Sequence, residues 1–260
     1  MSIPISILLH LLIQYTQDDY RGSDRNCSLP RIAASAILLK TKAGIRFSEV
    51  HKPMQQKIRN LMSKKKGNYH RPLQSISEFA RWLELLDKID AKVGMEIGVR
   101  HGGSAHWTLN CLPGIERYIG VDIQPNDRSG WLAKAHESVR LVHEDSTSEK
   151  CRNTVKAILG ERKLDFLFID GMHDHHYVQS DWIMYHGLVR SGGLIGFHDI
   201  NFAPPCAELF RKVKNSGQWH EAIIADNTPE NYEEDFPPQA LKIAKKCNKI
   251  EGFGIGVVCI

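Results

Sequence analysis

Short hydrophobic runs alternate with segments of helical periodicity from residue 75 to the end of the chain. The expected strands are Val93–Ile97, Tyr118–Asp122, Arg140–His143, Leu164–Ile169, Leu194–Phe197 and Gly254–Cys259. The expected helices between them are Ser104–Cys111, Thr147–Leu159, Tyr177–Val189 and Pro205–Ser216. Continuously apolar strands separated by helices are typical of a parallel sheet that is covered on both faces. The pattern therefore predicts a doubly wound α/β fold.

A further helix is predicted in front of the first strand. The sequence from Ser75 to Glu78 has the spacing of a capping box, in which a serine side chain and a glutamate side chain pair with backbone N–H groups at a helix start. Apolar residues follow at helical spacing, and the helix is expected to end near Asp90. The locally acidic stretch Glu230–Asp235 is expected to be a solvated loop.

Residues 1–74 differ from the rest of the chain in their pattern of hydrophobic and polar residues. They show no alternation of strands and helices, and we expect an N-terminal extension, helical and partly flexible, in front of a domain over residues 75–260. The apolar run Ile3–Ile13 is too short to span a bilayer and is interpreted as a buried or partner-docking segment. The stretch Lys52–Arg71 is basic and contains no acidic residue.

Composition excludes several classes of protein. Of 260 residues, 42% are hydrophobic and 25% charged, the net charge is +4 and the mean hydropathy is −0.33, which is ordinary for a globular protein without membrane spans. The six cysteines include no CxxC pair, which argues against a zinc module and a disulfide scaffold. The absence of an export signal favours a cytoplasmic location with free thiols.

A glycine-rich turn follows the first strand and precedes a helix at Ser104. It contains Gly98, Gly102 and Gly103, a spacing that matches neither the dinucleotide fingerprint nor a phosphate-binding loop. Glu96 precedes the turn, where it would repel a pyrophosphate and attract a cationic amino-acid group. Ligands of doubly wound sheets bind beyond the carboxyl ends of the strands, so the turn is a candidate binding site. The alternative is a tight turn without a ligand.

Three successive strand ends carry an acidic residue. Asp122 follows the second strand and Asp145 the third, in addition to Glu96 at the first. An acid at the tip of the second strand is where ribose hydroxyls bind in nucleoside-binding folds of this type. Each acid alone is more often a surface residue, but the three together indicate a nucleoside site.

These residues resemble the class I S-adenosylmethionine-dependent methyltransferases, especially the branch of small-molecule sugar O-methyltransferases and cephalosporin-hydroxylase-like proteins. The matching stretches cover roughly residues 75–200 and are Glu96–Ser104, Gly120–Asp122, Leu164–His173 with Val178 and Asp181, and Gly192–Asp199. Gly254–Val258 suits the final strand of the family. The resemblance implies a Rossmann-like sheet of seven mostly parallel strands with helices on both faces.

The resemblance also implies the residues that bind S-adenosylmethionine. Glu96 and Gly98 would line its amino-acid moiety, and Gly102 and Gly103 would shape the turn up to Ser104. Asp122 would accept hydrogen bonds from the ribose, and Asp145, with Ser146 beside it, would lie at the adenine amino group. The chain departs from the family at His175, where relatives commonly have an aromatic residue, which leaves the substrate side less defined.

The acceptor side of the predicted site lies at two other strand ends. Asp170 and His173 follow the fourth strand, and His198 and Asp199 follow the fifth. The cluster predicts either an acid–base pair or a divalent-metal site, with Asp170, His198 and Asp199 as ligands. Some relatives hold Mg²⁺ at these positions, but His198 stands where they have an acid and would favour a softer cation. His173 is the preferred general base, because its ordinary pKa near ~6.5 leaves it neutral at working pH. The alternative is a structural histidine. Asp174 and Asp181 are interpreted as caps of the following helix.

The predicted function is S-adenosylmethionine-dependent O-methylation of a hydroxyl group on a small molecule, a sugar or natural product. Two alternatives stay open. A nucleic-acid methyltransferase could use the basic stretch Lys52–Arg71, although a solvated basic linker is the simpler interpretation. A non-catalytic cofactor-binding protein could have the same fold. A homo-oligomer is also compatible with the sequence.

Overall fold

The computed structural model describes residues 52–63, 72–124 and 130–260. The apolar run Ile3–Ile13 and the basic residues 64–71 lie outside the described residues. Helix α4 (Lys52–Ser63) packs against α5 (Ile76–Lys88) and α6 (Gly103–Cys111), with Met54 and Ile58 buried. The predicted domain boundary at residue 75 stays a prediction. None of the helices in the described part of the chain has the length and apolar composition that crossing a membrane requires.

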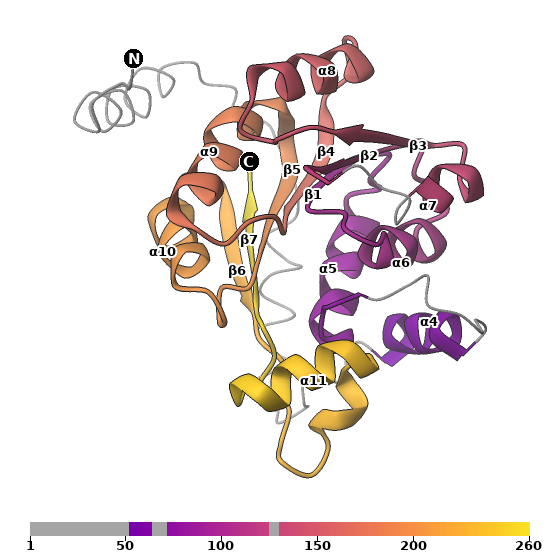
Figure 1. Ribbon diagram of the computed structural model, residues 1–260, viewed down its shortest axis with the longest axis vertical. Helices are drawn as coiled ribbons and strands as arrows, with labels where there is room; N and C mark the ends of the chain where they lie inside the picture. The colour runs from indigo at the N-terminus through magenta and orange to yellow at the C-terminus, as the bar shows by residue number, and fades with distance from the viewer. Residues whose placement is uncertain (1–51, 64–71, 125–129) are drawn as a thin grey trace.

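A seven-stranded sheet organises the described residues and confirms the predicted α/β fold (Figure 1). The strand order is β3-β2-β1-β4-β5-β7-β6, and only β7 runs against the others. The strands are β1 (Val93–Ile97), β2 (Arg117–Asp122), β3 (Val139–His143), β4 (Leu164–Ile169), β5 (Val189–His198), β6 (Trp219–Ile223) and β7 (Ile255–Cys259).

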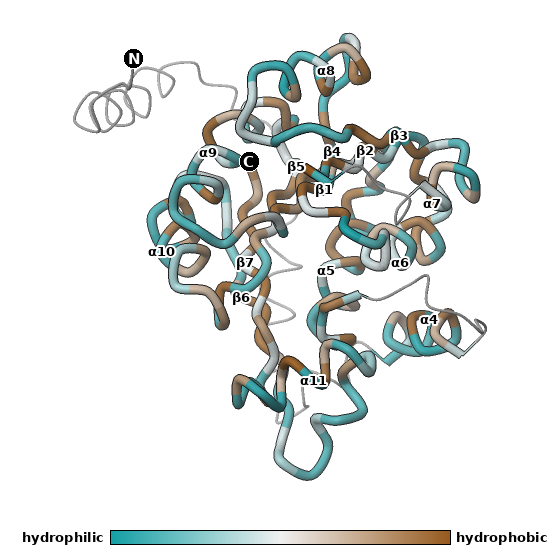
Figure 2. Tube along the Cα trace, in the orientation of Figure 1, coloured by the Kyte–Doolittle hydropathy of each residue, from teal (hydrophilic) through white to brown (hydrophobic). Residues whose placement is uncertain are grey.

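Helices cover both faces of the sheet. In Figure 1, α5, α6 and α7 (Gly130–Ala135) lie on one side, and α8 (Glu149–Leu159), α9 (His175–Tyr185) and α10 (Pro204–Val213) on the other. The two cores alternate along β4: Phe166 and Phe168 pack with the first group of helices, and Leu167 and Ile169 with the second. The strands are accordingly the most hydrophobic part of the trace in Figure 2. Burial on both faces explains why these strands have continuous apolar runs.

The last part of the fold departs from the sequence expectations. The expectations missed strand β6, which lies at the sheet edge, because only one of its residues is buried and no apolar run marks it. They also missed α7 and α11 (Pro238–Cys247), which lies beyond the sheet at the bottom of Figure 1. The predicted helix Tyr177–Val189 is shorter, because a 3₁₀ turn (His186–Leu188) leads directly into a longer β5.

The predicted capping box at Ser75 forms only in part. Ser75 caps α5 and accepts a hydrogen bond from the Glu78 backbone N–H, but the Glu78 carboxyl group does not return to Ser75. Instead it accepts hydrogen bonds from the backbone N–H groups of Ala225, Phe253 and Gly254. The long-range contact prevails because these loop N–H groups are buried and need an acceptor. Glu78 thereby attaches the loops around β6 and β7 to the start of α5.

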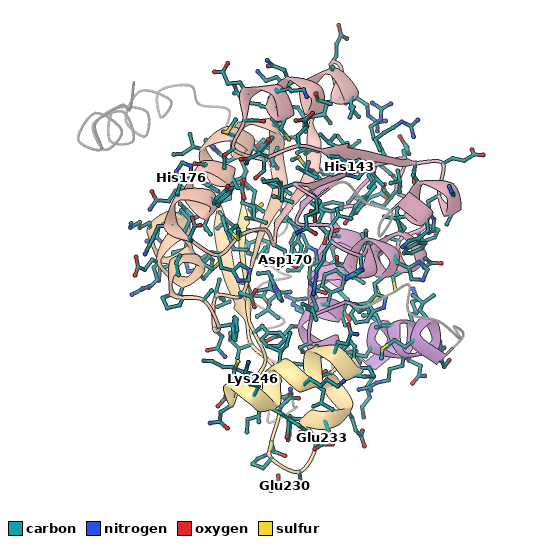
Figure 3. The ribbon with its side chains drawn as sticks, in the orientation of Figure 1. His143, Asp170, His176, Glu230, Glu233 and Lys246 are labelled. Atoms are coloured by element: carbon teal, nitrogen blue, oxygen red, sulfur yellow. The ribbon has the colours of Figure 1, made fainter. Side chains whose placement is uncertain are left out.

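The acidic stretch 230–235 is not wholly a solvated loop. Glu230 is exposed, and Figure 3 shows Glu230 and Glu233 at the lower edge of the molecule. Asp235, however, is buried and accepts hydrogen bonds from Ser75, Ser77 and Asn227. A carboxylate at the start of α5 is stabilised by the backbone N–H groups there. The segment before α11 is therefore fixed to the same helix end as the loops that Glu78 holds.

Candidate active site

Two cavities lie at the carboxyl ends of the parallel strands and share part of their walls. The β2–β3 cavity, of about 420 Å³, is lined by Asp122, Ile123, Asp145, Ser146 and Tyr177, among others. The β4–β5 cavity, of about 340 Å³, is lined by groups that include Gln74, His173, Asp199, Phe202 and Phe253. Both cavities have Gly98, Arg100, Asp170 and Gly171 in their walls. Figure 3 shows Asp170 near the centre of the molecule.

The glycines of the turn serve packing within the protein. Gly98 has φ +93°, and a Cβ atom there would come within 2.0 Å of the Asp170 carbonyl oxygen. The turn after β1 thus lies directly against the turn after β4. Gly102 has φ +80° at the start of α6, and a Cβ atom on Gly103 would come within 2.5 Å of the Pro72 backbone nitrogen. Larger residues cannot replace Gly98 or Gly103 without moving backbone.

Glu96 lies beneath the cavities and lines neither of them. Its side chain is fully buried, and its two carboxyl oxygens accept hydrogen bonds from the Ser104 and Tyr118 hydroxyl groups. Burial raises the pKa of Glu96 to about 8, although both hydroxyl donors oppose the shift. Of this group, Ser104 and the three turn glycines were also predicted to bind the cofactor. The structure places Ser104 between Glu96 and the wall of the β4–β5 cavity.

Asp122, Asp145 and Ser146 lie together on the wall of the β2–β3 cavity, as the sequence predicts for one ligand site. Asp122 accepts hydrogen bonds from the backbone N–H groups of Arg100 (2.7 Å) and Gln124 (3.0 Å). Asp145 accepts from the backbone N–H and the hydroxyl group of Thr147. Both carboxylates are thus fixed by nearby backbone.

Two exposed hydrophobic side chains flank the same cavity, and sequence reasoning missed them. Ile123 is 56% exposed and Met172 is 58% exposed, the highest values among the large hydrophobic residues of the described chain. Ile123 directly follows the predicted site residue Asp122, and Met172 follows Gly171 in the turn after Asp170. These sequence positions could have indicated that both side chains lie at the site. Apolar groups beside polar ones at a cavity mouth are typical of a binding site for a flat, partly apolar ligand.

The four predicted acceptor-side residues meet in one cluster. The His198 Nδ1 atom lies 3.0 Å from Asp170 Oδ1 and 3.1 Å from Asp199 Oδ2. The His173 Nε2 atom lies 2.9 Å from the same Asp199 oxygen and 4.0 Å from Asp170 Oδ1. His198 is buried against Phe168 and Phe253, whereas His173 is partly exposed at the β4–β5 cavity.

The carboxylates change the acid–base properties of both histidines. Asp170 and Asp199 raise the pKa of His173 to about 9. Burial acts to lower the pKa of His198, but the same two carboxylates outweigh it and hold this pKa well above 6.5. The imidazoles in turn hold the pKa of Asp199 below its usual range against the effect of burial. The ordinary histidine pKa assumed from the sequence does not apply to His173, because two anions stabilise its charged form.

The cluster fits a divalent cation, with one change from the predicted ligand set. One ligand atom each from Asp170, His173 and Asp199 lies within 4.8 Å of the others, a spacing suited to a shared ion. His198 is not in that group; its Nδ1 atom lies against both carboxylates, and its Nε2 atom is buried without a hydrogen-bond partner among the described residues. Two carboxylates and one imidazole suit Mn²⁺, Fe²⁺ or Zn²⁺ and are compatible with Mg²⁺.

The two aspartates next to this cluster differ in role. Asp174 caps α9 as predicted, accepting a hydrogen bond from the Tyr177 backbone N–H at 3.0 Å. Asp181 is not a cap, because it lies inside α9 with its carboxyl group fully buried. Burial raises its pKa to about 7. A carboxyl group within a helix interior cannot reach the free N–H groups of the first turn.

Comparisons with known proteins agree with this geometry. A family model described as a methyltransferase domain matches residues 95–200, the segment that carries β1 to β5. Over these residues the chain is similar to a methyltransferase domain. A comparison with curated proteins finds no match.

Two solved structures are similar in fold to this chain. The O-methyltransferase TomG from Streptomyces achromogenes, involved in tomaymycin synthesis and crystallised with S-adenosylmethionine, is 12% identical, with a TM-score of 0.51 over 82% of this chain and 89% of TomG. Cofactor-bound Rv0187 from MTB is 15% identical, with a TM-score of 0.51 over 91% of this chain and 99% of that one. At these identities the likeness shows the fold.

A third structure matches over a smaller part. MycE from the mycinamycin biosynthetic pathway, crystallised with Mg, S-adenosylhomocysteine and mycinamycin VI, is 19% identical, with a TM-score of 0.39 over 46% of this chain. The chain spans about a third (33%) of the length of MycE.

Proposed function

We propose that the protein transfers a methyl group from S-adenosylmethionine to a hydroxyl group of a small molecule, with a divalent cation at the acceptor. The observation that carries the proposal is the shared wall of the two cavities. A ligand in the β2–β3 cavity that extends past Gly98 and Gly171 reaches the Asp170–His173–Asp199 cluster, because these turns line both cavities. Cofactor and acceptor would then meet at that cluster.

The β2–β3 cavity suits the adenosine part of the cofactor. Asp122 is fixed by backbone and offers carboxylate oxygens to ribose hydroxyl groups, and Asp145 with Ser146 offers polar groups to the adenine edge. Ile123 and Met172 offer apolar surface to the faces of the base. Glu96, which lines neither cavity, would act indirectly by fixing Ser104 at the turn.

The β4–β5 cavity suits an acceptor with a ring. Phe202, Ile243 and Phe253 form an apolar wall, and the carboxylate–imidazole cluster lies in the same cavity. An acceptor with an apolar or carbohydrate ring can pack that ring against this wall and place its hydroxyl oxygen at the cluster. Methyl transfer forms the new C–O bond as the C–S bond of the sulfonium breaks, and the hydroxyl proton must leave.

His173 is placed to receive that proton once it has lost its own. Asp170 and Asp199 stabilise its protonated form, so the deprotonated imidazole is a strong base. When Asp170, His173 and Asp199 hold a divalent cation, His173 would be a ligand instead of the base, and the cation would supply a Lewis acid that orients and acidifies the hydroxyl group. Positioning of the acceptor oxygen in line with the sulfonium is the larger part of the rate enhancement.

The test separates cofactor binding from turnover. Calorimetry with S-adenosylmethionine should show binding, and NAD should not compete for the site. Methyl transfer to a panel of catechols, flavonoids and sugars should then form methyl ethers, fall on addition of EDTA, and recover with Mn²⁺ or Mg²⁺. Absence of S-adenosylmethionine binding refutes the proposal. If S-adenosylmethionine binds and methyl transfer is unchanged by EDTA, only the proposed role of the cation is refuted.

A further inference from the structure

Gln74 lies in front of the segment that the methyltransferase family model matches, yet it lines the β4–β5 cavity. It is 2% exposed. Its backbone is held from both sides: Pro72 packs closely on Gly103, and Ser75 is bound to the buried Asp235. These two contacts on either side of Gln74 fix its backbone, and with it the position of its side chain.

The side-chain amide of Gln74 contacts one specific atom of the cluster. Its Nε2 atom donates a hydrogen bond to Asp170 Oδ2 at 2.7 Å. The other oxygen of Asp170, Oδ1, is the one that lies 3.0 Å from His198 Nδ1 and 4.0 Å from His173 Nε2. The two oxygens of Asp170 thus have separate partners, with Gln74 on one side of the carboxylate and the histidines on the other.

The orientation of the amide is explained by Asp170 and not by packing. The Gln74 Oε1 atom is buried and has no hydrogen-bond partner within the described residues, which is unfavourable for a carbonyl group. Turning the amide over would place that oxygen against Asp170 Oδ2, oxygen against carboxylate oxygen. An apolar side chain of similar size would fill the space and leave no unpaired amide oxygen, but it would remove the hydrogen-bond donor of Asp170 Oδ2.

We propose that Gln74 is a positioning residue of the active site, which fixes the Asp170 carboxylate in the orientation that faces His173 and His198, beside the group that would hold a divalent cation. The inference rests on the proposed function, because it assigns Gln74 a role at the proposed cation site. It also places the Pro72–Gln74 segment in the active site, ahead of the first strand. Residues that hydrogen-bond a metal ligand typically change metal affinity about 10- to 100-fold when they are removed.

The experiment measures Mn²⁺ binding directly, by the loss of the free-ion signal in electron paramagnetic resonance. Gln74→Met keeps the size of the side chain and removes the donor, so the Kd for Mn²⁺ should rise about 10-fold or more. The melting temperature should change little, because removal of the unpaired buried oxygen offsets the loss of the hydrogen bond to Asp170. Gln218→Met is the control: Gln218 is exposed and also donates through Nε2, to the Ile260 carbonyl, and its loss should leave the Mn²⁺ affinity unchanged.

A double-mutant cycle tests whether Gln74 acts through Asp170. In an Asp170→Asn background, Gln74→Met should add less than 2-fold to the loss of Mn²⁺ affinity, because the carboxylate that it orients is gone. Additive losses, or a Gln74→Met variant with wild-type Mn²⁺ affinity, overturn the inference and leave the proposed function intact. If Gln74→Met does not fold, Gln74→Leu is measured instead. A wild-type protein that binds S-adenosylmethionine but no Mn²⁺ overturns both the cation and this inference.

Discussion

The β2–β3 cavity is lined almost entirely by the ends of β1 to β4 and the turns that follow them, whereas the β4–β5 cavity draws on residues from Gln74 to Phe253. In the first, backbone N–H groups at or near each turn hold Asp122 and Asp145. In the second, each carboxylate is held by side chains from other strands or loops. The difference indicates that the first cavity is a property of the sheet and its turns, and the second a property of the whole chain.

Electrostatics separate the two cavities in the same way. In the β4–β5 cavity two carboxylates raise the pKa of His173 to about 9 and that of His198, and the two imidazoles lower the pKa of Asp199. The charge state of one group in this cluster therefore depends on the charges of the others. A substitution in the cluster should therefore affect several groups at once, whereas one in the β2–β3 cavity should affect a single contact.

The largest effect is expected where the two cavities meet. In Gly98→Ala, the new Cβ atom would lie 2.0 Å from the Asp170 carbonyl oxygen at a φ of +93°, so the turns after β1 and β4 must separate. We expect a loss of about 3 kcal/mol or more in the free energy of unfolding, with loss of both cofactor binding and methyl transfer. Urea denaturation and calorimetry measure these effects. Gly187→Ala, with open space around the added atom, is the control and should change stability by at most about 1 kcal/mol. Intact cofactor binding in Gly98→Ala would show that the cavities do not share this wall.

The next effect is expected within the β4–β5 cavity alone. Asp199→Asn removes the charge that His173 and His198 share, and asparagine tolerates the φ of +62° at this position. Methyl transfer should fall by about 100-fold or more, while the Kd for S-adenosylmethionine changes less than about 3-fold. Asp174→Asn is the matched control, because asparagine caps a helix as well as aspartate does. An equal loss of cofactor affinity in Asp199→Asn would contradict the separation of the two cavities.

A smaller effect is expected in the β2–β3 cavity. Asp122→Ala removes the proposed ribose acceptor, which should weaken S-adenosylmethionine binding by about 1.5–3 kcal/mol, or one to two orders of magnitude. With saturating cofactor, kcat should stay near wild type, because the acceptor cluster is untouched. Calorimetry and steady-state kinetics distinguish the two parameters. Glu116→Ala, which removes an exposed pair with Arg162, should change neither. Unchanged affinity in Asp122→Ala would remove this residue from the site.

The smallest effect concerns the buried Glu96 beneath both cavities. Burial raises its pKa from the ordinary 4.5 to about 8, so the folded state keeps a proton that the unfolded state loses between these values. The free energy of unfolding should therefore decrease as the pH rises from 5 to 8. In Glu96→Gln this decrease should be smaller by at least about 1 kcal/mol, since one pKa unit corresponds to about 1.4 kcal/mol. Urea denaturation at pH 5.5 and 8.5 checks it, and parallel pH profiles of the two proteins would show that Glu96 is ionised when folded.

The strands next to the site were predictable because their burial is local in the sequence. Val93–Ile97 and Leu164–Ile169 have the predicted bounds, since strands covered on both faces require unbroken apolar runs. The side chains that follow them, including Asp122, Asp170 and Asp199, meet at one sheet edge because parallel strands all end there. Strand β6 and helix α11 were missed because their residues are largely exposed and have no such run.

The partners of the polar groups were not predictable. Glu78 was expected to close a capping box and instead binds loops about 150 residues away along the chain; Asp181 was expected to cap a helix and is buried. The same holds for Gln74, which carries no motif and gains its contact with Asp170 only through the packing of Pro72 on Gly103.

The sequence alone determined the sheet, the order of its strands along the chain and the set of acidic and imidazole groups at its edge, because hydrophobic periodicity and turn glycines act over a few residues. Only the tertiary structure brings Asp170 to 3.0 Å from His198, groups ligand atoms of Asp170, His173 and Asp199 within 4.8 Å of one another, and encloses Glu96. Hydrogen-bond partners and pKa values depend on distances of a few ångströms between groups that are far apart in the chain. Packing of the whole domain sets these distances.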